Sequence, residues 1–154
     1  MEHWCMSEKT FQVQAIEDWD GVAQAIIEQL RAPMILALSG PLGAGKTTLV
    51  QTLAHRLGVE GRPRSPTFSL LRTYTLPKEQ NGIKRLVHID AYRLEKASDV
   101  YALDLESELA EPGTIVAMEW PEQIRETLGS YHVPLLEVQI KPSVADERIV
   151  CLRF

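Results

Sequence analysis

The sequence is poor in cysteine and has no cluster of metal-binding residues around the two cysteines that it contains. Cys5 and Cys151 lie near opposite ends of the chain, without C-x-x-C spacing and without a cluster of histidines beside them. This pattern argues against a zinc site and predicts a protein of a reducing compartment. A disulfide between the two cysteines is the less favoured alternative.

Long hydrophobic runs and an excess of positive charge are also missing. No apolar run approaches the roughly 18 residues that a membrane span needs, and the N-terminus lacks a basic start followed by an apolar stretch. We therefore expect a cytoplasmic protein that does not bind membranes. The formal net charge of −5 argues against a broad nucleic-acid-binding face, so any link to nucleic acid is expected to be indirect. A length of 154 residues predicts a single domain, residues 1–154.

What the sequence does contain is a phosphate-binding loop motif. The run from Gly40 to Thr47, GPLGAGKT, fits G-x-x-x-x-G-K-[ST] at every fixed position. Its glycines let backbone N–H groups curl around an anion, Lys46 reaches the β and γ phosphates, and Thr47 offers a hydroxyl to magnesium. The residues expected to hold the nucleotide are Leu42, Gly43, Ala44, Gly45, Lys46, Thr47 and Thr48.

The segments on either side of this motif support it. Met34 to Leu38 is a fully apolar run typical of a buried strand, and the residues after Lys46 show helical spacing up to Gly58. A phosphate-binding loop needs this strand before it and this helix after it. A glycine-rich turn that matches by chance is the alternative, and the flanking pattern argues against it.

The rest of the chain predicts an α/β fold: a P-loop NTPase-like domain with a mixed central sheet, flanking helices and antiparallel hairpins. Further strands are expected at residues 11–15, 68–76, 85–90, 114–119, 135–141 and 148–152. A turn at residues 78–82 should join two of these strands. Helices are expected near residues 20–30, 99–109 and 121–128, the last opened by a proline.

Two apolar strands end on a carboxylate, Asp90 and Glu119. Ligands of open α/β sheets bind outside the carboxyl ends of the strands, so both acids are candidates for holding magnesium or orienting an attacking water. Glu119 is the stronger candidate, and a carboxylate that simply ends a strand in solvent is the alternative for each acid.

Two neighbours of these acids have different interpretations. His88 shares a strand face with Asp90 and is interpreted as a hydrogen-bonded structural residue rather than a general base. Trp120 is expected to point to the opposite face from Glu119, into the core, with a possible role beside the site.

The segment between the phosphate-loop helix and the next strand contains Ser65-Pro66-Thr67. Thr67 is a candidate for sensing the γ phosphate as a nucleotide switch does, and an ordinary turn is an equal alternative. Arginines surround this segment, and acidic residues crowd a later one; each is either a docking surface or a solvated face. The arginines are Arg56, Arg62, Arg64 and Arg72. The acidic residues are Glu95, Asp99, Asp104, Glu106, Glu108 and Glu111.

Four motifs, GPLGAGKTT, SPTF, HIDAYRL and MEWP, follow one another between about Gly40 and Pro121. In this order they resemble the bacterial tRNA threonylcarbamoyladenosine biosynthesis ATPase family, TsaE, formerly the YjeE family. The resemblance implies that Lys46 and its loop bind ATP and that Thr47 and Glu119 hold magnesium. It also implies that Asp90 and Thr67 belong to the active or switch site.

The resemblance further implies a Mg-dependent ATPase that is weak alone and depends on partners. It would support, rather than perform, threonylcarbamoyl transfer to tRNA, a reaction that belongs to TsaD with TsaB. This sequence departs from the family pattern in two places. Pro41 stands where the family commonly has an acidic residue, and Trp19 and Ala23 stand where it has a threonine and a glycine near the N-terminal helix, so the resemblance does not assign the adenine contacts. Phosphate binding is expected to survive the proline.

Other functions share the same loop motif. A small-molecule kinase needs an acceptor pocket and transition-state arginines, for which Arg62 and Arg64 are the candidates. A GTPase is disfavoured because no N-K-x-D motif exists and the only D-x-x-G lies before the phosphate loop. A nucleotide-gated binding module with negligible turnover of its own is the third alternative.

Overall fold

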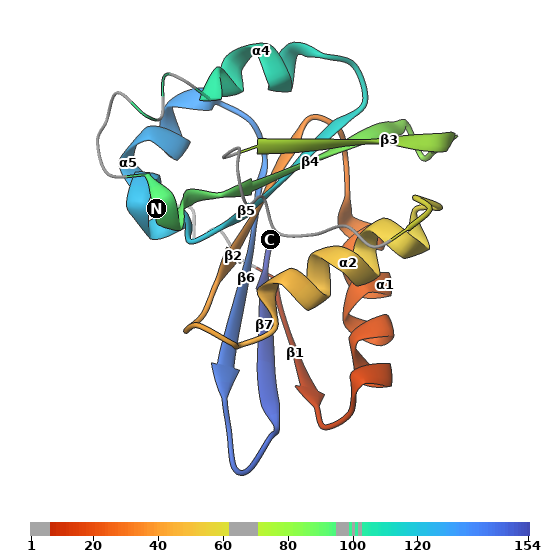
Figure 1. The fold of residues 1–154 in the computed structure, drawn as a ribbon, viewed down its shortest axis with the longest axis vertical. Helices are drawn as coiled ribbons and strands as arrows, with labels where there is room; N and C mark the ends of the chain where they lie inside the picture. The colour runs from red at the N-terminus through yellow and green to blue at the C-terminus, as the bar shows by residue number, and fades with distance from the viewer. Residues whose placement is uncertain (1–6, 62–70, 95–98, 100, 102) are drawn as a thin grey trace.

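A seven-stranded mixed sheet forms the centre of the computed structural model, which describes residues 7–61, 71–94, 99, 101 and 103–154. The strand order is β1-β7-β6-β2-β5-β4-β3, with β2 parallel to β5 and β6, and β4 parallel to β5. The remaining pairs, β1 with β7, β6 with β7 and β3 with β4, are antiparallel (Figure 1). The strands are β1 (Glu8–Val13), β2 (Met34–Ser39), β3 (Leu71–Gln80), β4 (Ile83–Asp90), β5 (Thr114–Glu119), β6 (Leu135–Pro142) and β7 (Arg148–Arg153).

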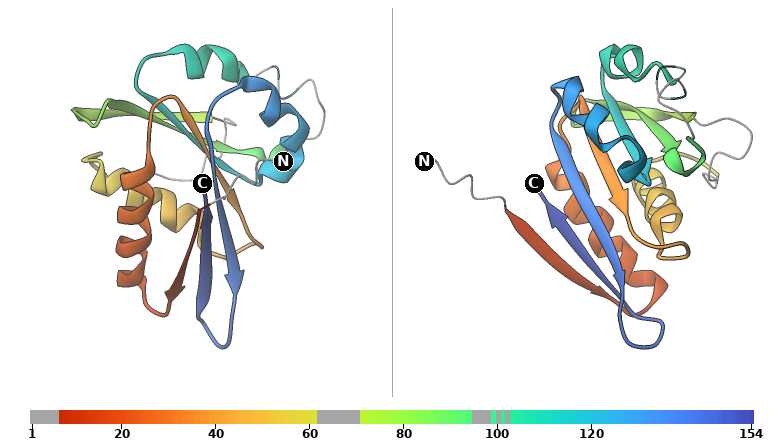
Figure 2. Two further views of the ribbon diagram at one scale, coloured as in Figure 1. Left: turned by 180° about the vertical axis from the view of Figure 1, so that it is seen from behind. Right: turned by 90° about the vertical axis from the view of Figure 1, so that its left-hand side faces the viewer.

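Helices cover both faces of this sheet (Figure 2). Helices α1 (Trp19–Gln29) and α2 (Lys46–Arg56) pack on one face, and α4 (Leu105–Ala110) and α5 (Arg125–Leu128) lie on the other. Short 3-10 turns connect the elements: η1 (Ile16–Asp18), η2 (Ala91–Arg93), η3 (Pro121–Ile124) and η4 (Gly129–Tyr131). The predicted α/β fold with a mixed sheet and antiparallel hairpins is therefore confirmed.

The alternation of side chains along the central strands builds two separate cores. Leu36 and Leu38 of β2 belong to the cluster beneath α1 and α2, whereas Ile35 belongs to the cluster beneath α4 and α5. All six residues of β5 are buried, because this strand lies between two parallel neighbours with helices on both sides. The central strands are thus fixed from both faces, and the loops at their carboxyl ends start from rigid positions.

Three local expectations were wrong in their bounds. Strand β1 spans Glu8–Val13 and not residues 11–15. Strand β3 continues to Gln80, so the hairpin turns at Asn81 and Gly82, both with positive φ, rather than over residues 78–82. The expected helix over residues 121–128 is instead a 3-10 turn, η3, followed by the short α5. In the part of the chain that the structure describes, no helix is long and apolar enough to span a membrane.

Candidate phosphate-binding site

The loop between β2 and α2 is shaped by glycine. Gly45, at the start of α2, has a φ of +114°, which L side chains rarely adopt. A Cβ atom on Gly45 would lie 2.5 Å from the ring of Trp19, which is buried against the loop. The first turn of a helix leaves N–H groups without intrahelical acceptors, and the earliest bond of α2 runs from the N–H of Leu49 to the carbonyl of Gly45. The loop therefore presents backbone donors and the positive end of a helix to an anion.

Lys46 is folded onto its own loop. Its side chain is buried, and the ammonium donates hydrogen bonds to the carbonyl oxygens of Gly40 and Pro41. Burial lowers the pKa of Lys46, against the opposing attraction of Glu119, Glu122 and Asp90. The Lys46 ammonium is thus held next to the loop by two neutral carbonyl oxygens, and a phosphate oxygen can replace them as the hydrogen-bond acceptor.

Trp120 packs against the core beneath α4 and α5, as expected from the alternation along β5. It also lies beside the site: β5 ends at Glu119, Trp120 has a φ of +59°, and the Lys46 ammonium lies 3.9 Å from the centroid of its ring. A cation over an indole face is attracted by the ring's quadrupole. Trp120 therefore forms part of the wall around Lys46.

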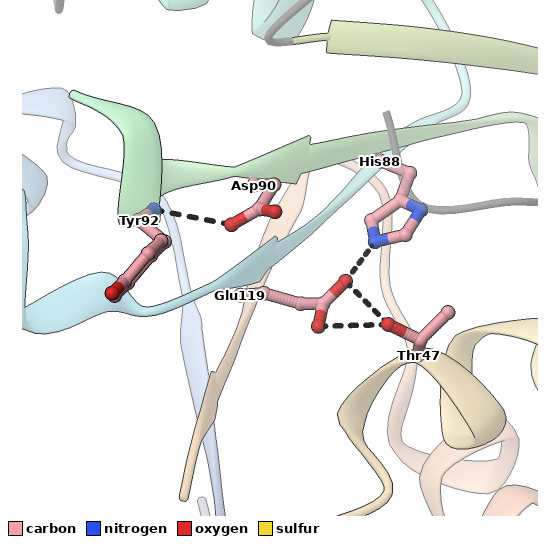
Figure 3. Close-up of polar contacts among 5 residues, drawn as sticks. All are labelled: Thr47, His88, Asp90, Tyr92 and Glu119. Carbon is pink, nitrogen blue, oxygen red and sulfur yellow. Dashed lines mark hydrogen bonds and ion pairs between the residues drawn. The ribbon is translucent and has the colours of Figure 1, made fainter. Parts of the chain in front are cut away.

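Glu119 is the most tightly held acid of the site (Figure 3). It is buried, and the hydroxyl of Thr47 lies 3.0 Å from Oε1 and 3.2 Å from Oε2. Nε2 of His88 lies 2.6 Å from Oε2. Burial by itself raises the pKa of Glu119, but His88, Thr47 and Lys46 together outweigh it and keep this pKa below its ordinary value. The carboxylate is therefore ionised at neutral pH.

Asp90 lies directly opposite Glu119 in the pairing of β4 with β5. One of its carboxylate oxygens accepts a hydrogen bond of 3.1 Å from the N–H of Tyr92, which fixes the side chain at the start of η2 (Figure 3). Because parallel strands end at the same edge of the sheet, the two acids meet beside the phosphate loop as the sequence predicts. His88 is hydrogen-bonded, in keeping with its expected structural character; the contact with Glu119 was not expected.

A cavity of about 450 Å³ brings the predicted residues together. It is lined by Leu42, Gly43, Ala44, Gly45, Lys46, Thr47, Thr48, Asp90, Tyr92, Glu119 and Trp120. Every predicted site residue that the structure describes is in this set. Thr67, with Arg62 and Arg64, lies outside the described residues.

Arg148 is a residue of the site that sequence reasoning missed. It begins β7, and its guanidinium donates to the carbonyl oxygens of Ala44 and Gly43 at 3.3 and 3.4 Å. With Trp19 and Asp146 it also lines a second cavity of about 240 Å³ on the other side of the loop. No sequence motif marks Arg148, because only the pairing of the C-terminal hairpin with the sheet brings it to the loop.

The described residues include no group of three or more His, Cys, Asp or Glu side chains able to hold a metal by themselves. Magnesium does not need such a cage, because proteins bind it through one or two carboxylates together with phosphate oxygens and water. The buried Glu119 carboxylate with the Thr47 hydroxyl fits that donor set. The pair would serve a metal that arrives with a phosphate ligand.

Together, the strand–loop–helix unit and the acids at the carboxyl ends of β4 and β5 define an α/β protein of the phosphate-binding-loop class. The profile of the family described as "Threonylcarbamoyl adenosine biosynthesis protein TsaE" matches residues 13–150. The chain belongs to this family and acts in the biosynthesis of threonylcarbamoyladenosine in tRNA.

Individual relatives agree with the family match. The chain is 35% identical to the tRNA threonylcarbamoyladenosine biosynthesis protein TsaE of Mycobacterium leprae, over 90% of this chain and 89% of that protein. It is 38% identical to the TsaE protein of Streptomyces coelicolor over 82% of each chain. The crystal structure of Bacillus subtilis YdiB superposes with a TM-score of 0.67 at 25% identity, covering 98% of this chain and 88% of the other.

Proposed function

We propose that this protein binds ATP with magnesium in the cavity between the phosphate loop and the strand ends, and hydrolyses it slowly to support threonylcarbamoyladenosine formation. The observation that carries the proposal is the meeting of Lys46, Thr47, Asp90 and Glu119 around one cavity of about 450 Å³. This volume lies in the range of pockets that hold small-molecule ligands.

Each residue has a role that follows from its position. The N–H groups at the start of α2 hold phosphate oxygens, and Lys46 exchanges the carbonyls of Gly40 and Pro41 for the β and γ phosphates. Thr47 and Glu119 would hold magnesium, which neutralises charge that develops on the transferred phosphoryl group. Asp90 lies opposite Glu119 and is proposed to orient the attacking water.

Steady-state ATP hydrolysis in the presence of magnesium tests this proposal, with Lys46→Ala as the blank. We expect weak hydrolysis by the wild-type chain, a marked increase on addition of the TsaB–TsaD pair, and loss of both in Lys46→Ala. Hydrolysis that depends on Lys46 but ignores these partners would favour a small-molecule kinase. Absence of ATP binding by the wild-type chain would refute the proposed function.

A nucleotide-gated binding module is a second candidate, and the mouth of the cavity favours it. Leu42 and Tyr92 both line the cavity, yet their exposed fractions are 86% and 60%. Large apolar side chains at a cavity mouth are typical of surfaces that a partner covers. TsaD with TsaB is the proposed partner, and tRNA would be reached only through it.

The two candidates differ in what Glu119→Ala changes. If nucleotide state controls docking, we expect this variant to weaken both ATP hydrolysis and ATP-dependent binding to the TsaB–TsaD pair. Binding can be measured by titration with and without Mg-ATP. A variant that loses hydrolysis but keeps the ATP dependence of binding would contradict gating.

A further inference from the structure

His88 is a polar residue in a place where packing alone would favour an apolar one. Its side chain is fully buried on β4, two residues after Leu86, which belongs to the core beneath α1 and α2. One ring nitrogen, Nε2, contacts Glu119, and the other, Nδ1, is buried with no hydrogen-bond partner in the described part of the chain. A buried polar atom without a partner destabilises the folded state. The contact with Glu119 is the described polar interaction that offsets this cost.

Two described contacts of the Glu119 carboxylate, with Thr47 and with His88, differ in what they determine. The Thr47 hydroxyl lies at nearly equal distances from both oxygens, 3.0 and 3.2 Å, so it does not select between them. The His88 contact is shorter, 2.6 Å, and reaches Oε2 alone. Figure 3 shows His88 and Thr47 on the same side of the carboxylate, away from Asp90. Of these two contacts, the one with His88 therefore distinguishes the two oxygens of the carboxylate.

We propose that His88 is a positioning residue for the metal-binding carboxylate: its Nε2–H holds Oε2 of Glu119 and leaves Oε1 available to the metal. This inference rests on the proposed function, because it assigns His88 to the proposed Mg-ATP site. His88 does not line the cavity and has no exposed surface, so it acts through Glu119 and not on the nucleotide.

The same contact keeps Glu119 away from Lys46. The two residues attract each other electrostatically across the site. A Glu119 carboxylate released from His88 would be drawn toward the ammonium and would compete with phosphate for it. The contact of His88 with Oε2 therefore has two effects. It keeps the Glu119 carboxylate available to the metal, and it leaves the Lys46 ammonium available to the phosphates.

Two amide substitutions separate this role from simple packing. In His88→Gln the longer side chain can place an N–H donor where Nε2 lies, whereas the shorter side chain of His88→Asn cannot reach Glu119. Both variants replace the ring by a neutral amide, so each serves as the control for the other. The readout is the magnesium concentration at which ATP binding is half-maximal, together with ATP binding in EDTA.

We expect His88→Asn to raise the magnesium midpoint about tenfold or more, as loss of a hydrogen bond to a metal-binding side chain commonly does. His88→Gln should remain within a few-fold of wild type, and ATP binding in EDTA should be the same in all three proteins. Equal magnesium midpoints would overturn the proposal. So would an equal loss of ATP binding with and without magnesium in both variants, because that is the result of a purely structural role.

A measurement on the wild-type chain covers the case in which a variant fails to fold. The ¹⁵N resonances of the four histidines report which ring nitrogen carries the proton, and His88 is assigned from its absence in a folded His88 variant or by selective labelling. We expect the proton of His88 on Nε2, with a change of that resonance in Glu119→Ala. A proton found only on Nδ1 would overturn the proposal. Because this test needs no nucleotide, it is independent of whether the chain binds ATP.

Discussion

At the scale of single residues, Gly45 shows how the site depends on the absence of a side chain. Its left-handed backbone opens the loop, and the Trp19 ring occupies the space that a Cβ would need. Trp19 is one of the positions at which this sequence departs from the resemblance, so the indole and the glycine act together in this protein. The loop conformation is thus set by packing from α1 as well as by the motif itself.

Replacing Gly45 by Ala should reduce both stability and ATP binding. The strained φ costs roughly 1–3 kcal/mol in the free energy of unfolding, and the contact with Trp19 adds to this cost. Gly21→Ala is the matched control, because Gly21 lies inside α1 and an added Cβ would meet no other atom within 4 Å. We expect this variant to have a free energy of unfolding about 0.5–1 kcal/mol higher than that of wild type. Urea unfolding and ATP titration measure both effects. Equal behaviour of the two variants would contradict the argument.

At the scale of elements, the C-terminal hairpin contributes to a loop that precedes it by about a hundred residues. Arg148 at the start of β7 donates to the carbonyl oxygens of Gly43 and Ala44. The hairpin thereby acts on the phosphate loop without contributing to its motif.

Arg148→Gln should weaken ATP binding about three- to tenfold, the equivalent of one or two ordinary hydrogen bonds. Arg153→Gln removes the same charge from the same strand at a residue that lines neither cavity of the site. We expect its ATP affinity to equal that of wild type. If both variants weaken ATP binding equally, the effect is one of net charge and not of the contact with the loop.

Elements also explain which parts of the site the sequence could predict. Asp90 and Glu119 were predictable because parallel strands end at a common edge, a rule that needs no knowledge of the intervening chain. The core packing of Trp120 was predictable from period-2 alternation along β5. Its contact with Lys46 was not, because nothing in the local residues marks the change to positive φ after Glu119. Arg148 could not be predicted, because its contact depends on the order of strands in the complete sheet.

At the scale of the whole molecule, binding of Mg-ATP should increase the free energy of unfolding of the protein. A ligand that binds only the folded state stabilises it by about 2.7 kcal/mol at one hundred times its dissociation constant. For a chain of 154 residues, this predicts an increase in melting temperature of about 5–10 °C with saturating Mg-ATP.

Differential scanning fluorimetry measures this shift. Lys46→Ala should show little or none of it at the same ATP concentration. An equal shift in wild type and Lys46→Ala would place ATP elsewhere on the protein and contradict the assignment of the cavity.

The strand order has a consequence for how the protein is made. Strand β2, which leads into the phosphate loop, pairs only with β5 and β6, and β7 inserts between β6 and β1. A nascent chain that already contains the complete GPLGAGKT motif therefore holds a hydrophobic strand without its neighbour β5 until Glu119, and without its neighbour β6 until Pro142, has been synthesised. The phosphate loop should consequently become able to bind nucleotide only in a late stage of synthesis, in a single step. Nascent chains that stop before residue 135 should bind chaperones rather than nucleotide.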